Sequence, residues 1–279
     1  MTINNDRRVS INNQWNNAFL RPARPGWWNR PVGRPDYWYG WGNSVRRHWY
    51  VNNYHRRYFY GNWWYDRPYW YGGWHYGWHV GRYPARYWWT VPTWAVVTNW
   101  FAWGPAPQQV WAQPVYYDYG PQGNVVYQNN VVTIGGQEVG SPAEFAMSAA
   151  DLATIPAPET DEQAEAAEWL PLGTFAVSSS DQDVEPTRLL QLAVSREGLI
   201  SGSLYNTETD EALNVQGQVD RETQRTAFRI GESEDVVVET GLGNLTQDEA
   251  AALVHYGPDR TETWLLVRLE TPEEDDEEE

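Results

Sequence analysis

The chain has no cysteine and no lysine among its 279 residues. Without cysteine it can form no disulfide framework, and it has neither a thiol nucleophile nor a thiolate metal site. Without lysine it cannot contain the phosphate-binding motif GxxxxGK, and the dinucleotide motif GxGxxG is absent as well. These absences exclude thiol chemistry and the common nucleotide-binding loops.

Long apolar runs are missing too. The sequence has no run of about 18 apolar residues, so we expect no membrane-spanning helix. The stretch after Met1, TINNDRRVSINNQWNN, is polar and lacks the apolar core of a signal peptide. Read literally, the printed chain contains no export signal.

The net charge of -17 is divided unevenly along the chain. Residues 1–111 hold 13 Arg against Asp6, Asp36 and Asp66, which gives +10, whereas residues 112–279 hold 7 Arg against 34 acids, which gives -27. Seventeen of the 19 Trp also lie in the basic part. Halves of opposite charge indicate two parts of different character.

Residues 1–120 form an Asn-rich and then Trp/Tyr/Arg/Gly/Pro-rich segment, which we expect to be largely irregular. Two short helices are expected, one capped by Asn43 and one opening after Pro92. Three roles stay open for this segment: packing against the remaining chain, adhesion by stacking on glycans or other copies, and single-stranded nucleic-acid binding. The candidate stacking residues are Trp63, Trp64, Trp70, Trp74, Trp78, Trp88 and Trp89.

Residues 121–168 are predicted to form a linking module of one hairpin and two short helices. Asn129 and Asn130 separate two β-branched runs, VVYQ and VVTI, as a hairpin turn would. Ser141 and Glu144 have the spacing of a capping box, and Pro142 follows the expected N-cap. Thr160 and Gln163 share the same spacing, which predicts a second short helix.

Residues 169–272 predict an all-β domain of eight short strands. Turn signals such as REG, TETD and GPDRTE separate the strands, and connections this short favour a sequential antiparallel meander. Closing the sheet removes its exposed edges, so we expect an eight-stranded barrel that resembles the calycin architecture in pattern. Residues 273–279, EEDDEEE, should be a disordered acidic tail.

The barrel interior is expected either to be filled by side chains or to hold one small ligand. Tyr205, Phe228 and Trp264 lie in three different strands and are the candidates for lining such a cavity. A register error of one residue would move any of them to the other face. A ligand-binding barrel tethered by the aromatic segment is therefore the alternative to an adhesive protein.

No catalytic, metal or cofactor site is expected. His75 and His79 are four residues apart, but Gly77 lies between them and no HExxH order is present, so a zinc site is not predicted. His255 stands in a predicted strand, where a structural role is more common than general-base catalysis. The serines Ser178 to Ser180 lack a GxSxG elbow. We therefore predict a protein that is not an enzyme.

Several stretches carry a resemblance to a known family, among them WLPLGTFAVS, QLAVSREGLISGSLYNTETD, VQGQVDRETQRTAFRIGE and PVYYDYGPQGNVVYQNN. The chain resembles the mu-protocadherin-like cell-surface proteins of planctomycetes over nearly its whole length. The resemblance implies export to the cell envelope and contact with polysaccharide or protein there. It does not imply calcium-dependent adhesion, because the chain has no cadherin-like repeats with Asp-rich calcium motifs between them.

Members of that family begin with a signal peptide, which the resemblance places upstream of the printed Met1. We expect the start to be truncated or misassigned, so that reading the gene upstream in frame uncovers an apolar signal segment. The combined prediction is a non-enzymatic envelope protein whose aromatic/Arg segment mediates adhesion or assembly. Nucleic-acid binding ranks third, behind the ligand-binding barrel.

Overall fold

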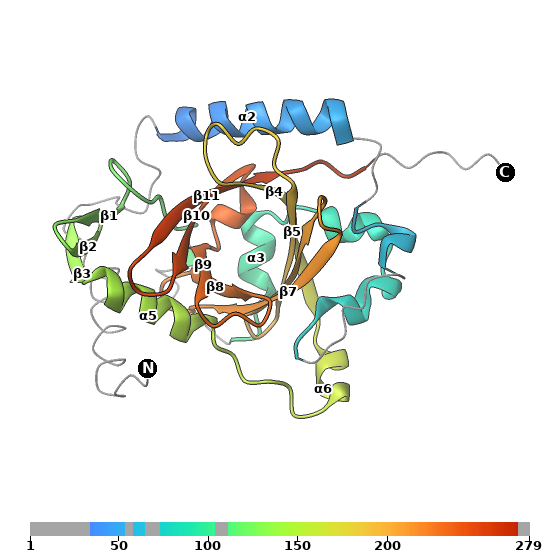
Figure 1. Ribbon diagram of the computed structural model, residues 1–279. Helices are drawn as coiled ribbons and strands as arrows, with labels where there is room; N and C mark the ends of the chain where they lie inside the picture. The colour runs from blue at the N-terminus through green and yellow to red at the C-terminus, as the bar shows by residue number, and fades with distance from the viewer. Residues whose placement is uncertain (1–33, 54–57, 65–72, 104–110, 273–279) are drawn as a thin grey trace.

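The computed structural model describes residues 34–53, 58–64, 73–103 and 111–272 of the chain (Figure 1). The helical elements are α2 (Arg34–Asn53), η1 (Gly61–Trp64), η2 (Tyr76–Arg82), η3 (Ala85–Trp89), α3 (Trp94–Trp100), α5 (Pro142–Ala153), α6 (Asp161–Ala166) and η4 (Asn244–Thr246). The strands of the small sheet are β1 (Val125–Gln128), β2 (Val131–Ile134) and β3 (Gln137–Gly140). The predicted tail 273–279 and the Asn-rich start lie outside the described residues.

Eight further strands form a closed antiparallel barrel, as the sequence predicted. They are β4 (Trp169–Ser178), β5 (Arg188–Ser195), β6 (Leu199–Asn206), β7 (Glu211–Val219), β8 (Arg225–Ile230), β9 (Val236–Gly241), β10 (Glu249–Tyr256) and β11 (Thr261–Arg268). Each strand pairs with its neighbour in sequence, and β11 returns to pair with β4, Leu265 lying opposite Ser178. Full closure leaves no unpaired strand edge in the barrel.

One face of the barrel strands points inward and is strongly apolar. Strand alternation and register place Leu192, Ile200, Val215, Phe228 and Leu266 on this face, and all five are buried. A Cβ on Gly217 would lie 2.0 Å from the carbonyl oxygen of Ala227 and 2.5 Å from Phe228 Cα, so glycine permits the close approach of β7 and β8. Large side chains thus occupy the interior, as in small eight-stranded barrels.

Arg268 is a charged residue on the inward face, where the register also places Arg188 and Glu262. Its guanidinium donates to the carbonyls of Leu172 (2.8 Å), Leu245 (2.6 Å) and Gln247 (3.0 Å), and its Cζ lies 4.4 Å from the ring centroid of Phe175. Burial lowers the pKa of Arg268 to about 10. The side chain ties the start of β4 to the loop before β10 and closes that part of the barrel.

The outward face of the barrel carries many polar residues, yet it is covered. The aromatic elements η1, η2 and η3, the helices α2 and α5 and the small sheet pack around it, α2 above the barrel and α5 below (Figure 1). Trp41 donates its indole N–H to Ser178 Oγ at 2.7 Å, and Tyr76 donates its hydroxyl to Gln191 Oε1 at 2.9 Å. One hydrophobic core therefore extends from α2 to the end of β11.

The linking module follows its predicted local signals. Asn129 and Asn130 have φ of 53° and 59°, the left-handed pair that a two-residue hairpin turn requires. Ser141 and Glu144 form the complete capping box at the start of α5. Thr160 accepts from Gln163 N at the start of α6.

The expected helix start at Asn43 is wrong, because α2 begins nine residues earlier, at Arg34. Asp36 lies in its first turn, where an acid is favourable. Gly40 and Gly42 disfavour a helix locally, which concealed this start in the sequence. Packing outweighs that cost: a Cβ on Gly42 would lie 2.7 Å from Glu249 Cγ, so glycine permits close approach to β10. The helix expected after Pro92 is confirmed, and Thr93 caps it.

Candidate functional site

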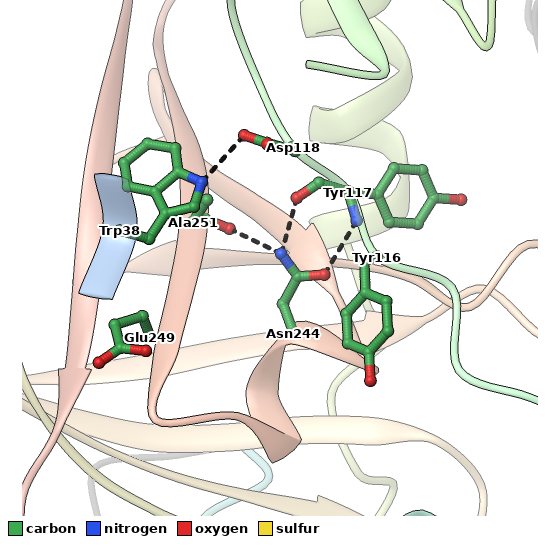
Figure 2. Close-up of a pocket in the computed structure, with 7 residues that line it drawn as sticks. All are labelled: Trp38, Tyr116, Tyr117, Asp118, Asn244, Glu249 and Ala251. Carbon is green, nitrogen blue, oxygen red and sulfur yellow. Dashed lines mark hydrogen bonds between the residues drawn. The ribbon is translucent and has the colours of Figure 1, made fainter. Parts of the chain in front are cut away.

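A small hollow lies where α2 meets the barrel, lined by Trp38, Tyr116, Tyr117, Asp118, Asn244, Glu249 and Ala251 (Figure 2). The Asn244 amide donates to the carbonyls of Tyr117 (2.7 Å) and Ala251 (3.3 Å), and its oxygen accepts from Tyr117 N at 2.9 Å. It thereby joins the segment before β1 to β10.

Two carboxylates at this hollow bind groups of α2. Asp118 Oδ1 accepts from the Trp38 indole N–H at 3.2 Å, and Glu249 Oε1 accepts from Arg46 Nη2 at 2.5 Å. Figure 2 shows the Trp38 ring and the Glu249 carboxylate on the same side of the Asn244 amide. Because these polar groups bind one another, the hollow fixes the position of α2 on the barrel.

The opposite face of α2 is exposed and aromatic. We call it the α2 face, comprising Tyr37, Tyr39, Arg47, Tyr50 and Val51. Tyr39 is 59% exposed and Tyr50 63%, the largest exposed fractions of any aromatic side chain among the described residues. The guanidinium of Arg46 lies 6.0 Å from the ring centroid of Tyr39. Exposed rings held on a rigid helix form a surface suited to binding.

The predicted stacking tryptophans occupy different places. Trp64, Trp88 and Trp89 are buried in the core, where their rings cannot meet a ligand while the segment stays packed. Trp63 and Trp74 are half-buried, and Trp74 donates its indole N–H to the carbonyl of Pro156. Trp70 and the side chain of Trp78 lie outside the described residues.

The three predicted cavity residues do not share one face of the barrel. Phe228 and Trp264 lie on the inward face, where both are buried. Tyr205 lies on the outward face, with its ring centroid 5.4 Å from that of Tyr58 and 5.1 Å from that of Trp63. The strand register therefore separates the candidates, and Tyr205 belongs to the contact with the aromatic segment.

A buried charged cluster lies on the outward face beneath α5, and sequence reasoning did not identify it. Glu239 accepts from Arg225 Nε at 2.9 Å, and Arg225 also donates to Ser148 Oγ at 2.7 Å. His255 Nε2 lies 3.6 Å from the Glu239 carboxylate. The sequence signal for this cluster was weak: Arg225, Glu239 and His255 stand on three neighbouring strands, and only the strand register shows that they share one face.

The pKa of Glu239 reflects opposing effects. Burial raises it, but the charge of Arg225 and the hydrogen bond and charge of His255 outweigh burial and lower the pKa below its ordinary value. Burial and the charge of Glu239 raise the pKa of the nearby Tyr127 hydroxyl. The cluster thus holds a charged carboxylate beneath α5, a structural role that needs no solvent access.

His75 and His79 are both buried in the aromatic segment. His75 Nδ1 accepts from Gly77 N at 2.8 Å and caps η2, while His79 Nδ1 lies 3.1 Å from Arg82 Nη1. Within the described ranges no group of three or more His, Cys, Asp or Glu side chains is placed to hold a metal ion. The two histidines serve as hydrogen-bond acceptors within the segment.

Comparisons with protein-family models, with curated proteins and with solved structures find no match to this chain. In the part of the chain that the structure describes, no helix is both long and apolar enough to cross a membrane. The candidate surfaces therefore rest on the geometry and chemistry of their own residues.

Proposed function

We propose that this chain is a non-enzymatic protein of the cell envelope that binds polysaccharide through the α2 face. The observation that carries this proposal is the high exposure of Tyr39 and Tyr50 on a helix that is otherwise anchored in the core. Tyrosine offers a large flat ring, a hydroxyl for hydrogen bonding and few torsions to freeze on binding. The envelope location is inferred from the family resemblance.

The anchoring of α2 supports this role. Trp38, Trp41 and Val45 are buried against the barrel, and the hydrogen bonds of Trp41 and Arg46 tie the helix to Ser178 of β4 and Glu249 of β10. A surface held rigid before binding loses less conformational entropy when the ligand arrives. The barrel acts in this proposal as the scaffold that presents the rings.

Charge favours a neutral polysaccharide over a nucleic acid. Residues 1–111 are basic, but the charge of Arg46 on α2 is already balanced by Glu249, which leaves less positive charge for a polyanion to bind. Arg47 adds a positive charge to the α2 face, but the exposed Asp36 on the same helix adds a negative one, so the two charges offset each other. Stacking of sugar rings on Tyr39 and Tyr50 needs no charge neutralisation.

The packed inward face weighs against the alternative of a small-ligand barrel. Phe228 and Trp264, two of the three residues predicted to line a cavity, are buried with Leu192 and Leu266 as core side chains. A ligand there would have to displace close-packed side chains, which is costly. We therefore place binding on the outer surface.

The test is co-sedimentation of the full chain with insoluble cell-wall polysaccharide, with single-stranded RNA as a competitor. We expect the double variant Tyr39→Ala/Tyr50→Ala to lose about tenfold or more in affinity, since each lost ring contact contributes on the order of 1 kcal/mol. Tyr83→Ala is the matched control, because Tyr83 is 46% exposed but lies outside the α2 face. Binding that survives the double variant, or that RNA abolishes, would rule the proposal out.

A further inference from the structure

Residues 74–89, which we call the strap, lie across the outward face of the barrel, on its right-hand side in Figure 1. Tyr76 is the central contact: its backbone N–H donates to Ser201 Oγ at 3.0 Å and its hydroxyl to Gln191 Oε1. Tyr87 donates its hydroxyl to the carbonyl of Trp169 at 3.2 Å. Trp88, near the end of the strap, is fully buried.

His75 holds the strap only in its neutral form. Its Nδ1 accepts the backbone N–H of Gly77, and a proton on that nitrogen would remove the acceptor and uncap η2. The ring is buried, stacked on Tyr76 at 5.2 Å between centroids, and lies beside the neutral side chain of Asn214. Burial lowers the pKa of His75 to about 3, despite the hydrogen bond to Asn214.

His79 repeats the arrangement one turn further along. Its Nδ1 faces Arg82 Nη1, and because a guanidinium only donates, this nitrogen must accept. Protonation would lose that bond and place two cations side by side. Burial and the charge of Arg82 both lower the pKa of His79.

Several other ionisable groups lie on the elements packed around the two rings. They are Tyr76, Arg82, Tyr83, Arg86 and Tyr87 of the strap, Asp161, Glu162 and Glu165 of α6, and Glu168 immediately before β4. Arg82 donates to the backbone carbonyl of Glu165 and not to its side-chain carboxylate. Burial, followed by the charges of Tyr83 and Glu168, raises the pKa of the Tyr87 hydroxyl. The direct partners of both histidine rings are thus neutral or cationic.

We propose that protonation of His75 and His79 releases the strap from the barrel in acidic solution and uncovers the aromatic rings beneath it. His75 Nδ1 accepts from a backbone N–H and His79 Nδ1 from a guanidinium, and neither donor can act as an acceptor instead. A proton on either Nδ1 therefore breaks a hydrogen bond that holds η2. The free histidine binds a proton more readily than the buried one, so acid favours the open form. The barrel strands remain folded because their hydrogen bonds do not involve these groups.

The experiment follows amide hydrogen exchange of the full chain by mass spectrometry, corrected for intrinsic rates, from pH 7 to pH 3. We expect residues 74–89 to lose protection within the window between pH 6.5, the ordinary histidine value, and about 3, while β5 and β6 keep theirs. Binding of a hydrophobic dye should rise over the same range. Protection of the strap down to pH 3, or its loss together with β5 and β6, would overturn the proposal.

Three variants separate histidine titration from general acid sensitivity. His75→Asn/His79→Asn keeps side-chain acceptors and should lower the release midpoint by about one pH unit or more. Asn214→Asp places a carboxylate beside the His75 ring and should also lower the midpoint, which keeps the test usable if the double variant fails to fold. His48→Asn, on α2, is the control and should not shift it. Equal midpoints in all variants would contradict the proposal.

Discussion

Trp88 offers the most direct perturbation of the contact between the aromatic segment and the barrel. Its side chain is fully buried, and its ring centroid lies 5.0 Å from that of Tyr76 and 5.1 Å from that of Tyr87. Truncation to alanine removes this buried ring and leaves a cavity. Buried tryptophan-to-alanine changes cost about 3–5 kcal/mol, and we expect Trp88→Ala to destabilise the chain by that amount.

The assay is urea denaturation followed by far-UV circular dichroism, which reports the barrel strands. The loss should appear as a lower midpoint with an unchanged slope, since the surface exposed on unfolding stays similar. Tyr50→Ala is the matched control: its ring is 63% exposed, and such surface changes usually alter stability by less than about 0.5 kcal/mol. A Trp88→Ala loss as small as that of the control would refute the packing of this segment on the barrel.

Three further predictions test the barrel and its outer face. Gly217→Ala should destabilise the chain by about 1–3 kcal/mol through overlap with the Ala227 carbonyl oxygen and with Phe228, whereas Gly81→Ala, where a Cβ meets nothing within 4 Å, should not; equal urea midpoints would contradict the close approach of β7 and β8 at Gly217. Tyr76→Phe should cost about 1–3 kcal/mol in the same assay, because it leaves Gln191 Oε1 buried without its donor, and Tyr83→Phe is the neutral control. Glu239→Gln should cost about 3–5 kcal/mol at pH 7 by leaving Arg225 buried without its charge partner. Because the pKa of Glu239 lies below 4.5 in the folded chain, its stabilisation is complete above that value and is lost as pH falls through the folded pKa; a wild type and variant whose stabilities do not converge in acid would refute this role.

The barrel could be predicted from the sequence because its signals are local. Alternating β-branched and polar residues between short turns predicted every strand of β4–β11 to within a few residues. The hairpin was equally accessible, since Asn129 and Asn130 tolerate the left-handed backbone that its turn requires. Closure followed from the number of strands and the short connections.

The outer layer could not be predicted in the same way. Gln191, Ser201 and Ser203 have the pattern of a solvent-facing row, and nothing local to these strands indicates that Tyr76 covers them. The irregular aromatic segment has no period from which its buried side could be read. Its rings are positioned by contacts more than 100 residues away in sequence, such as that between Tyr76 and Gln191.

The candidate site also combines features that the sequence indicated with features that depend on long-range packing. The aromatic composition drew attention to residues 61–89, but the rings of Trp64, Trp88 and Trp89 are buried in the core. The exposed rings lie instead on α2, whose start was concealed by Gly40 and Gly42. Tyr205 was assigned to the possible cavity because strand alternation alone does not say which face is inward.

Hydroxyl-radical footprinting of the full chain, with and without insoluble cell-wall polysaccharide, tests the proposed binding surface most directly. Tyr39 and Tyr50 are exposed and should oxidise readily in the free chain. We predict that polysaccharide protects both residues and leaves Tyr83 unchanged. Unchanged oxidation of Tyr39 and Tyr50 in the bound fraction, or protection centred on another surface, would contradict binding through the α2 face.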